Sequence, residues 1–109
     1  MPYDEQLASR VRGLLQRRSG VTEKKMFGGI AFMLHGNMCV GISHGSLIVR
    51  IGPDAYEAAL QEDYVSEFDF TGRPMRGWIV VEEAGLVHFA AVKDWTDRAV
   101  DFVKTLPAK

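Results

Sequence analysis

Hydrophobic residues near the start of the chain follow the period of a helix. They lie three or four positions apart and are Leu7, Val11, Leu14 and Leu15. This spacing places them on one stripe and predicts a helix over residues 4–18, which Ser19-Gly20 would end. The same period returns from about His88, so we predict a last helix that ends at Pro107.

The middle of the chain alternates between apolar and polar positions, which is typical of strands. Three such stretches are separated by short turns, and they are residues 26–34, 38–42 and 47–51. The residues predicted to share one face are Ile30, Phe32 and Leu34 in the first stretch and Met38, Val40 and Ile42 in the second. We therefore predict three antiparallel strands joined in series.

The second half of the chain begins with a short helix and continues as a hairpin. Pro53 and Asp54 favour the start of a helix over residues 54–62. Residues 64–70 and 76–82 then alternate again on either side of a turn. The predicted order is helix, three strands, helix, two strands, helix. This order indicates a two-layer α+β fold in which helices pack on an antiparallel sheet.

The composition is that of one ordinary domain. With 109 residues, of which 47% are hydrophobic, the chain can bury a core without disulfides, and we expect residues 1–109 to form a single domain. Cys39 is the single cysteine, which excludes an internal disulfide. The first residues lack the apolar stretch of a secretory signal, and no apolar run is long enough to cross a membrane. We therefore expect a cytoplasmic protein.

Charge is balanced over the whole chain and uneven along it. The formal net charge is −1, but the first 25 residues carry an excess of basic side chains. Those that could contact the phosphates of a nucleic acid are Arg10, Arg17, Arg18, Lys24 and Lys25. The alternative is that these residues form the solvated face of an amphipathic helix. The calculated pI of 6.3 also speaks against a nucleic-acid-binding domain, because such domains are usually basic.

Few residues suggest catalysis or metal binding. His35 and His44 flank one predicted strand and His88 lies far from them, while Cys39 has no thiol partner at a zinc-like spacing. We interpret Cys39 as a small buried residue of that strand. Gly28-Gly29 leads into another apolar strand and lacks the lysine of a phosphate-binding loop, so we interpret it as a bulge or a close approach of another element. We therefore predict no enzyme activity, no metal and no cofactor.

One hairpin combines aromatic residues, arginines and glycines within residues 68–78. The functional interpretation is a partner-binding surface, and its residues are Phe70, Arg73, Met75, Arg76 and Trp78. The structural interpretation is a tight hairpin whose Phe70 and Trp78 face the core while both arginines are solvated. Several methionines could likewise line an adaptable groove or only fill the core, and they are Met26, Met33, Met38 and Met75.

Three blocks of the sequence resemble one known family, and they are residues 24–33 (KKMFGGIAFM), 52–60 (GPDAYEAAL) and 68–78 (FDFTGRPMRGW). In this order they are similar to the TfoX/Sxy N-terminal domain. The resemblance implies an α+β fold similar to type III secretion chaperones, which commonly pair, and hence a homodimer. It also implies a regulator of natural competence that acts with the cyclic-AMP receptor protein, and it supplies no catalytic residue.

Two functions follow from these observations. The first is a non-enzymatic regulatory or adaptor domain that binds a protein partner, such as the cyclic-AMP receptor protein, and reaches DNA indirectly. The second is direct DNA binding through the basic residues at the start of the chain. We expect no membrane partner for either function.

Overall fold

A six-stranded antiparallel sheet with the order β1-β2-β3-β4-β6-β5 organises the computed structural model, which describes residues 3–26, 28–69 and 72–109. The elements in chain order are α1 (Glu5–Leu15), β1 (Val21–Met26), β2 (Gly29–Leu34), β3 (Asn37–Ser43), β4 (Ser46–Arg50), α2 (Tyr56–Ala59), β5 (Val65–Asp69), β6 (Pro74–Val81), the 3-10 helix η1 (Glu83–Leu86) and α3 (Phe89–Val103). The predicted α+β class with helices on an antiparallel sheet is confirmed.

The sheet contains a strand that the hydrophobic pattern did not predict. The expected strand over residues 26–34 is divided, because Met26 ends β1, Gly29 begins β2 and these two residues pair across the turn. Most side chains of β1 are exposed and polar, because this strand lies at the edge of the sheet and few residues pack against it. An edge strand of this kind has no apolar alternation to detect.

Gly28 lies in the turn between β1 and β2, and Gly29 is the first residue of β2, so the bulge expected there is wrong. Gly28 has a φ of +77°, which favours glycine. The alternative expectation, a close approach of another element, is confirmed at Gly29, where an added Cβ would collide with the carbonyl oxygen of Ile42.

Both predicted terminal helices are present with shorter or shifted bounds. Asp4 caps α1 because its Oδ1 accepts hydrogen bonds from the backbone N–H groups of Gln6 and Leu7, at 2.9 and 3.2 Å. The helix ends at Leu15, three residues before the predicted end. The middle helix is also shorter than residues 54–62, since α2 spans Tyr56–Ala59.

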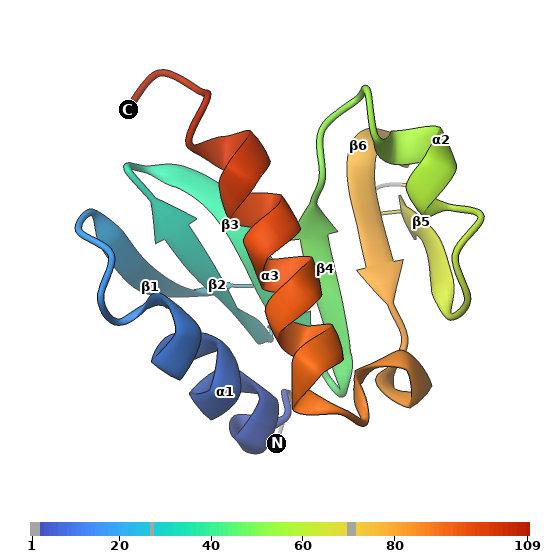
Figure 1. The fold of residues 1–109 in the computed structure, drawn as a ribbon, viewed down its shortest axis with the longest axis horizontal. Helices are drawn as coiled ribbons and strands as arrows, with labels where there is room; N and C mark the ends of the chain where they lie inside the picture. Colours follow the sequence, from blue (N-terminus) through green and yellow to red (C-terminus); the bar gives the residue numbers. More distant parts are fainter. Residues whose placement is uncertain (1–2, 27, 70–71) are drawn as a thin grey trace.

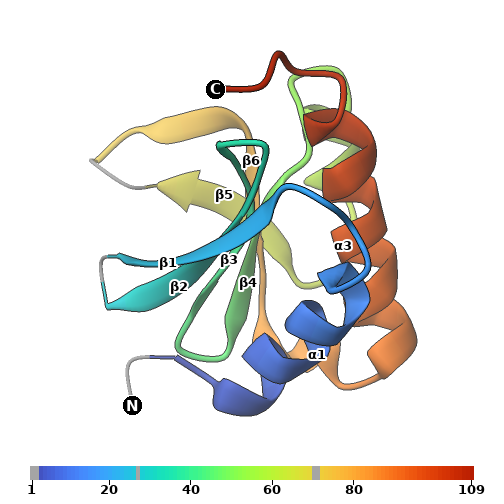
Figure 2. The same ribbon diagram turned by 90° about the vertical axis from the view of Figure 1, so that its left-hand side faces the viewer.

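Helices α1 and α3 cover one face of the sheet (Figures 1 and 2). Alternate strand residues such as Leu47, Val49 and Ile79 are fully buried beneath them. The helical residues that complete this core are Leu7, Val11 and Leu15 from α1 and Val92, Ala99, Val100 and Val103 from α3. We call this side of the sheet the covered face and the other side the open face.

A bulge in β3 changes which residues point to each face. Phe32 of β2 pairs with Val40, but the next residue, Met33, pairs with Met38, so Cys39 is an extra residue in β3. Cys39 and Val40 are both buried in the core as a result. The prediction that Met38 shares a face with Val40 and Ile42 is therefore wrong, because Met38 lies half-buried on the open face.

No helix in residues 3–26, 28–69 and 72–109 is long and apolar enough to cross a membrane.

Candidate functional site

The open face of the sheet carries an apolar groove of about 360 Å³. In Figure 2 the hairpins β1–β2 and β5–β6 both project to the side away from α1 and α3. Residues of both hairpins line the groove. Its lining residues come from every strand of the sheet and are Met26, Gly29, Ile30, Ala31, Met38, Gly41, Ile42, Ser43, Ile48, Phe68, Met75 and Trp78. The groove therefore requires the whole sheet and cannot be assigned to one hairpin.

Small residues in the middle strands form the floor of the groove and leave space above it. Ala31 of β2 pairs with Gly41 of β3, and Gly41 pairs with Ile48 of β4. A Cβ added at Gly41 would lie 2.7 Å from the Cε of Met38 and 3.8 Å from the Cβ of Ile48. The missing side chain at Gly41 thus lets the flexible end of Met38 lie across the floor.

Aromatic residues of the last hairpin form one wall. The rings of Phe68 in β5 and Trp78 in β6 have centroids 6.1 Å apart and planes inclined by 41°. Trp78 is half-buried, and its neighbours Ile79 and Gly77 are buried. The wall is therefore a fixed aromatic surface, while the methionines opposite are flexible and polarisable.

Arg50 places a positive charge beside this wall. It ends β4 and pairs in register with Trp78 of β6. Its guanidinium carbon lies 5.0 Å from the centroid of the Trp78 ring and 5.9 Å from that of Phe102 on α3, which are distances of cation–π contacts. No hydrogen bond or ion pair joins Arg50 to a carboxylate among the residues that the structure describes. Within the described ranges, the contacts found for its guanidinium are with these two rings.

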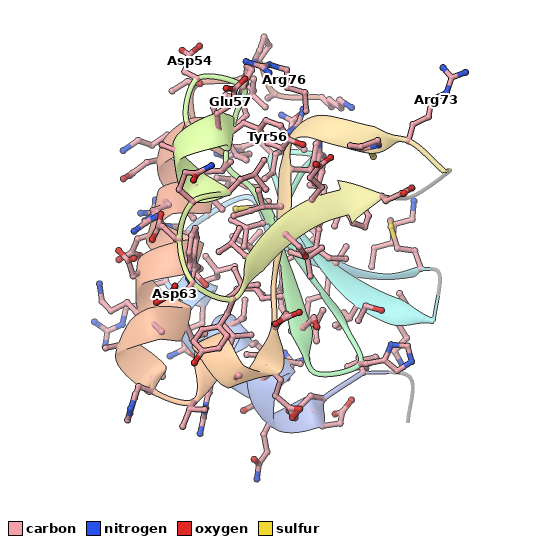
Figure 3. The ribbon with its side chains drawn as sticks, turned by 90° about the vertical axis from the view of Figure 1, so that its right-hand side faces the viewer. Asp54, Tyr56, Glu57, Asp63, Arg73 and Arg76 are labelled. Carbon is pink, nitrogen blue, oxygen red and sulfur yellow. The ribbon has the colours of Figure 1, made fainter. Side chains whose placement is uncertain are left out.

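The structure separates the residues that the sequence grouped on the last hairpin. Met75 and Trp78 line the groove. Arg73 is exposed near the tip of the hairpin and points away from the body of the molecule (Figure 3). Arg76 lies toward α2, where its Nη1 donates to Glu57 Oε1 at 3.0 Å and its guanidinium lies over Tyr56 at 5.6 Å (Figure 3). Phe70 lies outside the described residues.

The position of Trp78 distinguishes between the two interpretations of this hairpin given above. The structural interpretation placed Trp78 in the core, and this is wrong. Ile79 and Val81 are the residues of β6 that face the core, and Trp78 points to the opposite side. The methionines divide in the same way: Met26, Met38 and Met75 line the groove, and Met33 is half-buried outside it.

Sequence reasoning did not identify Ile48 and Arg50. The alternation of Leu47, Val49 and Ile51 assigned these three to the core face, so the residues between them had to face the other way. Ile48 is apolar although it points to the face opposite the core. The sequence therefore contained a signal that this opposite face is not fully exposed to solvent. Nothing in the sequence placed Arg50 next to Trp78, since that contact depends on the pairing of β4 with β6.

The basic residues of the first 25 positions are all exposed but do not share one surface. Arg10 lies on α1, and Arg17 and Arg18 follow its end. In β1, Lys24 shares the open face with Met26, whereas Lys25 alternates to the covered face.

An ion pair joins α1 to β1 between these basic residues. The guanidinium of Arg12 donates to both carboxylate oxygens of Glu23, at 2.7 and 2.8 Å. Hydrogen bonding to Arg12 lowers the pKa of Glu23 and raises that of Arg12. Glu23 thus neutralises one of the cations of α1 and interrupts the positive charge between the helix and the lysines of β1.

The remaining candidates for chemistry are isolated. Cys39 is buried, and desolvation raises the pKa of its thiol to about 12, so the reactive thiolate is not populated at neutral pH. His35 and His44 stand in the turns on either side of β3 with φ of +52° and +55°. Within the described part of the chain, no group of three or more His, Cys, Asp or Glu side chains could hold a metal ion.

Comparison with known proteins gives one result. A family model described as the TfoX N-terminal domain matches residues 13–103. No curated protein and no solved structure matches the chain. The likeness to type III secretion chaperones therefore stays a prediction.

Proposed function

Because this chain belongs to the TfoX N-terminal domain family, we propose that it is a regulatory or adaptor domain that binds another protein and carries out no reaction itself. The single observation that carries this proposal is the apolar groove on the open face of the sheet. A surface of this kind, with aromatic and methionine side chains around it, is common where a protein accepts the side chains of a partner.

The residues that could serve catalysis support a binding role. Nucleophilic catalysis by a cysteine needs a thiolate near neutral pH. The thiol of Cys39 is buried and has a pKa of about 12, and it lies on the covered side of the sheet rather than in the groove. The groove itself is lined by apolar side chains and Ser43, with no ionisable group among the described lining residues.

The partner that we propose is the cyclic-AMP receptor protein bound at a promoter in the cytoplasm. This choice extends the family's role in competence to the present chain, and it makes contact with DNA indirect. The net charge of −1 agrees with a domain that reaches DNA through a protein, because direct binding to phosphates is stronger for basic domains.

Fluorescence anisotropy of a labelled promoter duplex tests this proposal. We expect the domain alone to leave the anisotropy unchanged and to raise it further once the receptor protein has bound. A charge placed in the groove by Met38→Asp should abolish the second rise. The matched control, Arg17→Ala with Arg18→Ala, should keep it, and circular dichroism should show that all variants are folded.

The opposite pattern would favour direct DNA binding. In that case the domain alone would bind the duplex, the affinity would fall steeply with salt, and replacing Arg17 and Arg18 would weaken it. The same duplex, salt series and variants therefore distinguish the two functions.

A further inference from the structure

Arg50, at the end of β4 and between Trp78 of the groove wall and Phe102 of α3, is a feature that the proposed function leaves unused. A guanidinium with five donors is normally met by carboxylates, carbonyl groups or water. Arg50 is half-buried, and the contacts found for it among the described residues are with the rings of Trp78 and Phe102. Its neighbour in that contact, Trp78, is also a wall of the groove. An anion that reached Arg50 would therefore lie directly beside an apolar surface.

A second positive charge, that of Lys24, lies on the open face. Lys24 is two residues before the groove residue Met26 and so shares its face. No Asp or Glu occurs among the described residues that line the groove. By contrast, Arg98, which is half-buried as Arg50 is, pairs with Glu62 and Asp94. Among the described residues, neither Arg50 nor Lys24 pairs with a carboxylate, so a carboxylate of a bound molecule could pair with Arg50 beside the apolar groove.

The apolar lining of the groove and the positive charge of Arg50 indicate which kind of molecule can bind there. We propose that the groove binds an apolar segment of a partner polypeptide and that Arg50 pairs with a carboxylate next to that segment. This inference rests on the proposed function and names the chemistry of the partner's contact. Carboxylates suit the planar guanidinium, which can donate two parallel hydrogen bonds while it stays stacked on Trp78.

A polypeptide segment suits the shape and the lining of the groove. It lies on a sheet face that neither α1 nor α3 covers (Figure 2). Three of its lining residues are methionines, which adapt to side chains of different shapes. Such a groove can take apolar anchors that a helix or an extended segment presents at regular spacing.

Selection of peptides by the purified domain tests the inference. A phage-displayed library of random peptides is selected on the immobilised wild-type domain, after removal of phage that bind the Met38→Asp variant. We expect the enriched peptides to share a group of apolar residues beside an Asp or Glu. Enrichment of peptides without an acidic residue, or no enrichment above the library background, would overturn the inference.

Affinity is then measured with the enriched peptides by the fluorescence of Trp78. The chain has two tryptophans, so Trp95→Phe leaves Trp78 as the reporter. We expect Arg50→Gln to weaken binding about tenfold or more, because a hydrogen bond to a charged group is worth about 1.5–3 kcal/mol. Replacing the acidic residue of the peptide by its amide should cause a similar loss, and the two losses should not add.

Two further variants show whether the charge of Arg50 or the shape of the groove is responsible. Arg50→Lys should recover part of the affinity, because it keeps the positive charge. Arg76→Gln is the matched control, since Arg76 pairs with Glu57 on the side of α2 and should leave the affinity unchanged. An Arg50→Gln variant that binds the acidic peptide as tightly as the wild type would overturn the inference.

Failure of this inference can be told apart from failure of the proposed function. The peptide selection uses neither DNA nor the receptor protein. Acidic peptides that bind at Arg50, together with no anisotropy response to the receptor protein, would remove the transcriptional role alone. A response to the receptor protein that survives Arg50→Gln would instead remove the role of Arg50 alone.

Discussion

The two faces of the sheet are built from different residues and differ in what covers them. On the covered face, Leu47, Val49 and Ile79 are fully buried under α1 and α3. On the open face, the residues that alternate with them are half-buried, as Ile48 and Trp78 are, and they surround a groove. The same strands therefore carry two apolar surfaces, of which the chain itself covers one.

We infer from this difference that the covered face stabilises the fold and that the open face binds the partner proposed above. The covered face holds rigid, branched side chains whose packing fixes the relative positions of helices and strands. The open face holds methionines, an aromatic wall and an arginine without a carboxylate partner among the described residues, which are suited to meeting another molecule. Substitutions on the first face should change stability, and those on the second should change binding.

The largest expected effect is on the covered face. Phe32 is 1% exposed, so Phe32→Ala should lower the free energy of unfolding by about 3–5 kcal/mol through lost burial and the cavity left behind. Met38→Ala on the open face should lower the free energy of unfolding much less, because Met38 is half-buried and its neighbours can move. Urea denaturation measures the free energy of unfolding of both variants. Equal decreases would contradict the distinction between the two faces.

A second effect depends on pH. Burial raises the pKa of the Cys39 thiol from 9.0 to about 12. The unfolded chain therefore loses this proton first as the pH rises, so the free energy of unfolding should fall between pH 9.0 and about 12, by up to about 1.4 kcal/mol per pH unit. Well below pH 9.0 the thiol is protonated in both states and contributes no pH dependence.

Cys39→Ala is the control for this effect. Because tyrosines and lysines also titrate at high pH, the informative quantity is the difference in slope between wild type and variant. Denaturation at a series of pH values should give a flatter curve for the variant. Identical slopes would mean that Cys39 is not held in the core.

A smaller effect is expected at the ion pair between Arg12 and Glu23, at the rim of the covered face. The guanidinium makes two hydrogen bonds to the carboxylate, but the side chains are 46% and 36% exposed. Solvent screens such pairs, so Arg12→Ala should cost about 1 kcal/mol or less. Thermal melts at low and high salt measure this, and a loss as large as that of Phe32→Ala would show that an exposed ion pair stabilises the fold as much as a buried aromatic ring does.

The smallest effect on stability is expected at Gly41, on the floor of the groove. A Cβ there would meet only the flexible end of Met38 within 3 Å, so Gly41→Ala should change the free energy of unfolding by about 0.5 kcal/mol or less. The added methyl group should nevertheless narrow the groove and weaken the binding of the enriched peptides. Unchanged peptide affinity with a folded variant would show that the floor is not part of the binding site.

Period and turn signals in the sequence predicted much of the covered face. The stripes of α1 and α3 and the alternation of Leu47 with Val49 depend on local spacing, and local spacing is visible in the sequence. The polar edge strand β1 has no such pattern and was missed. Because Cys39 is an extra residue in β3, Met38 lies on the other face of the sheet. The alternation of apolar and polar residues in the sequence does not reveal such a shift of one residue.

The candidate site was predicted only in part for a related reason. Met75 and Trp78 were named because their hairpin has an unusual composition, and both line the groove. Arg73 and Arg76 were grouped with them by sequence distance, but Arg73 points away at the tip and Arg76 turns to Glu57. Arg50 was missed because β4 and β6 are distant in sequence and meet only in the sheet. The homodimer expected from the resemblance stays a prediction.

The most direct test of the account is to observe the groove methionines during binding. The chain has five methionines, and Met26, Met38 and Met75 line the groove. With methyl-labelled methionine and nitrogen-15-labelled tryptophan, NMR spectra are recorded as the domain is titrated with the cyclic-AMP receptor protein on promoter DNA. The account predicts that the methyl signals of these three residues shift or broaden while the indole N–H of the covered residue Trp95 does not. Binding that leaves all three groove signals unchanged would contradict it.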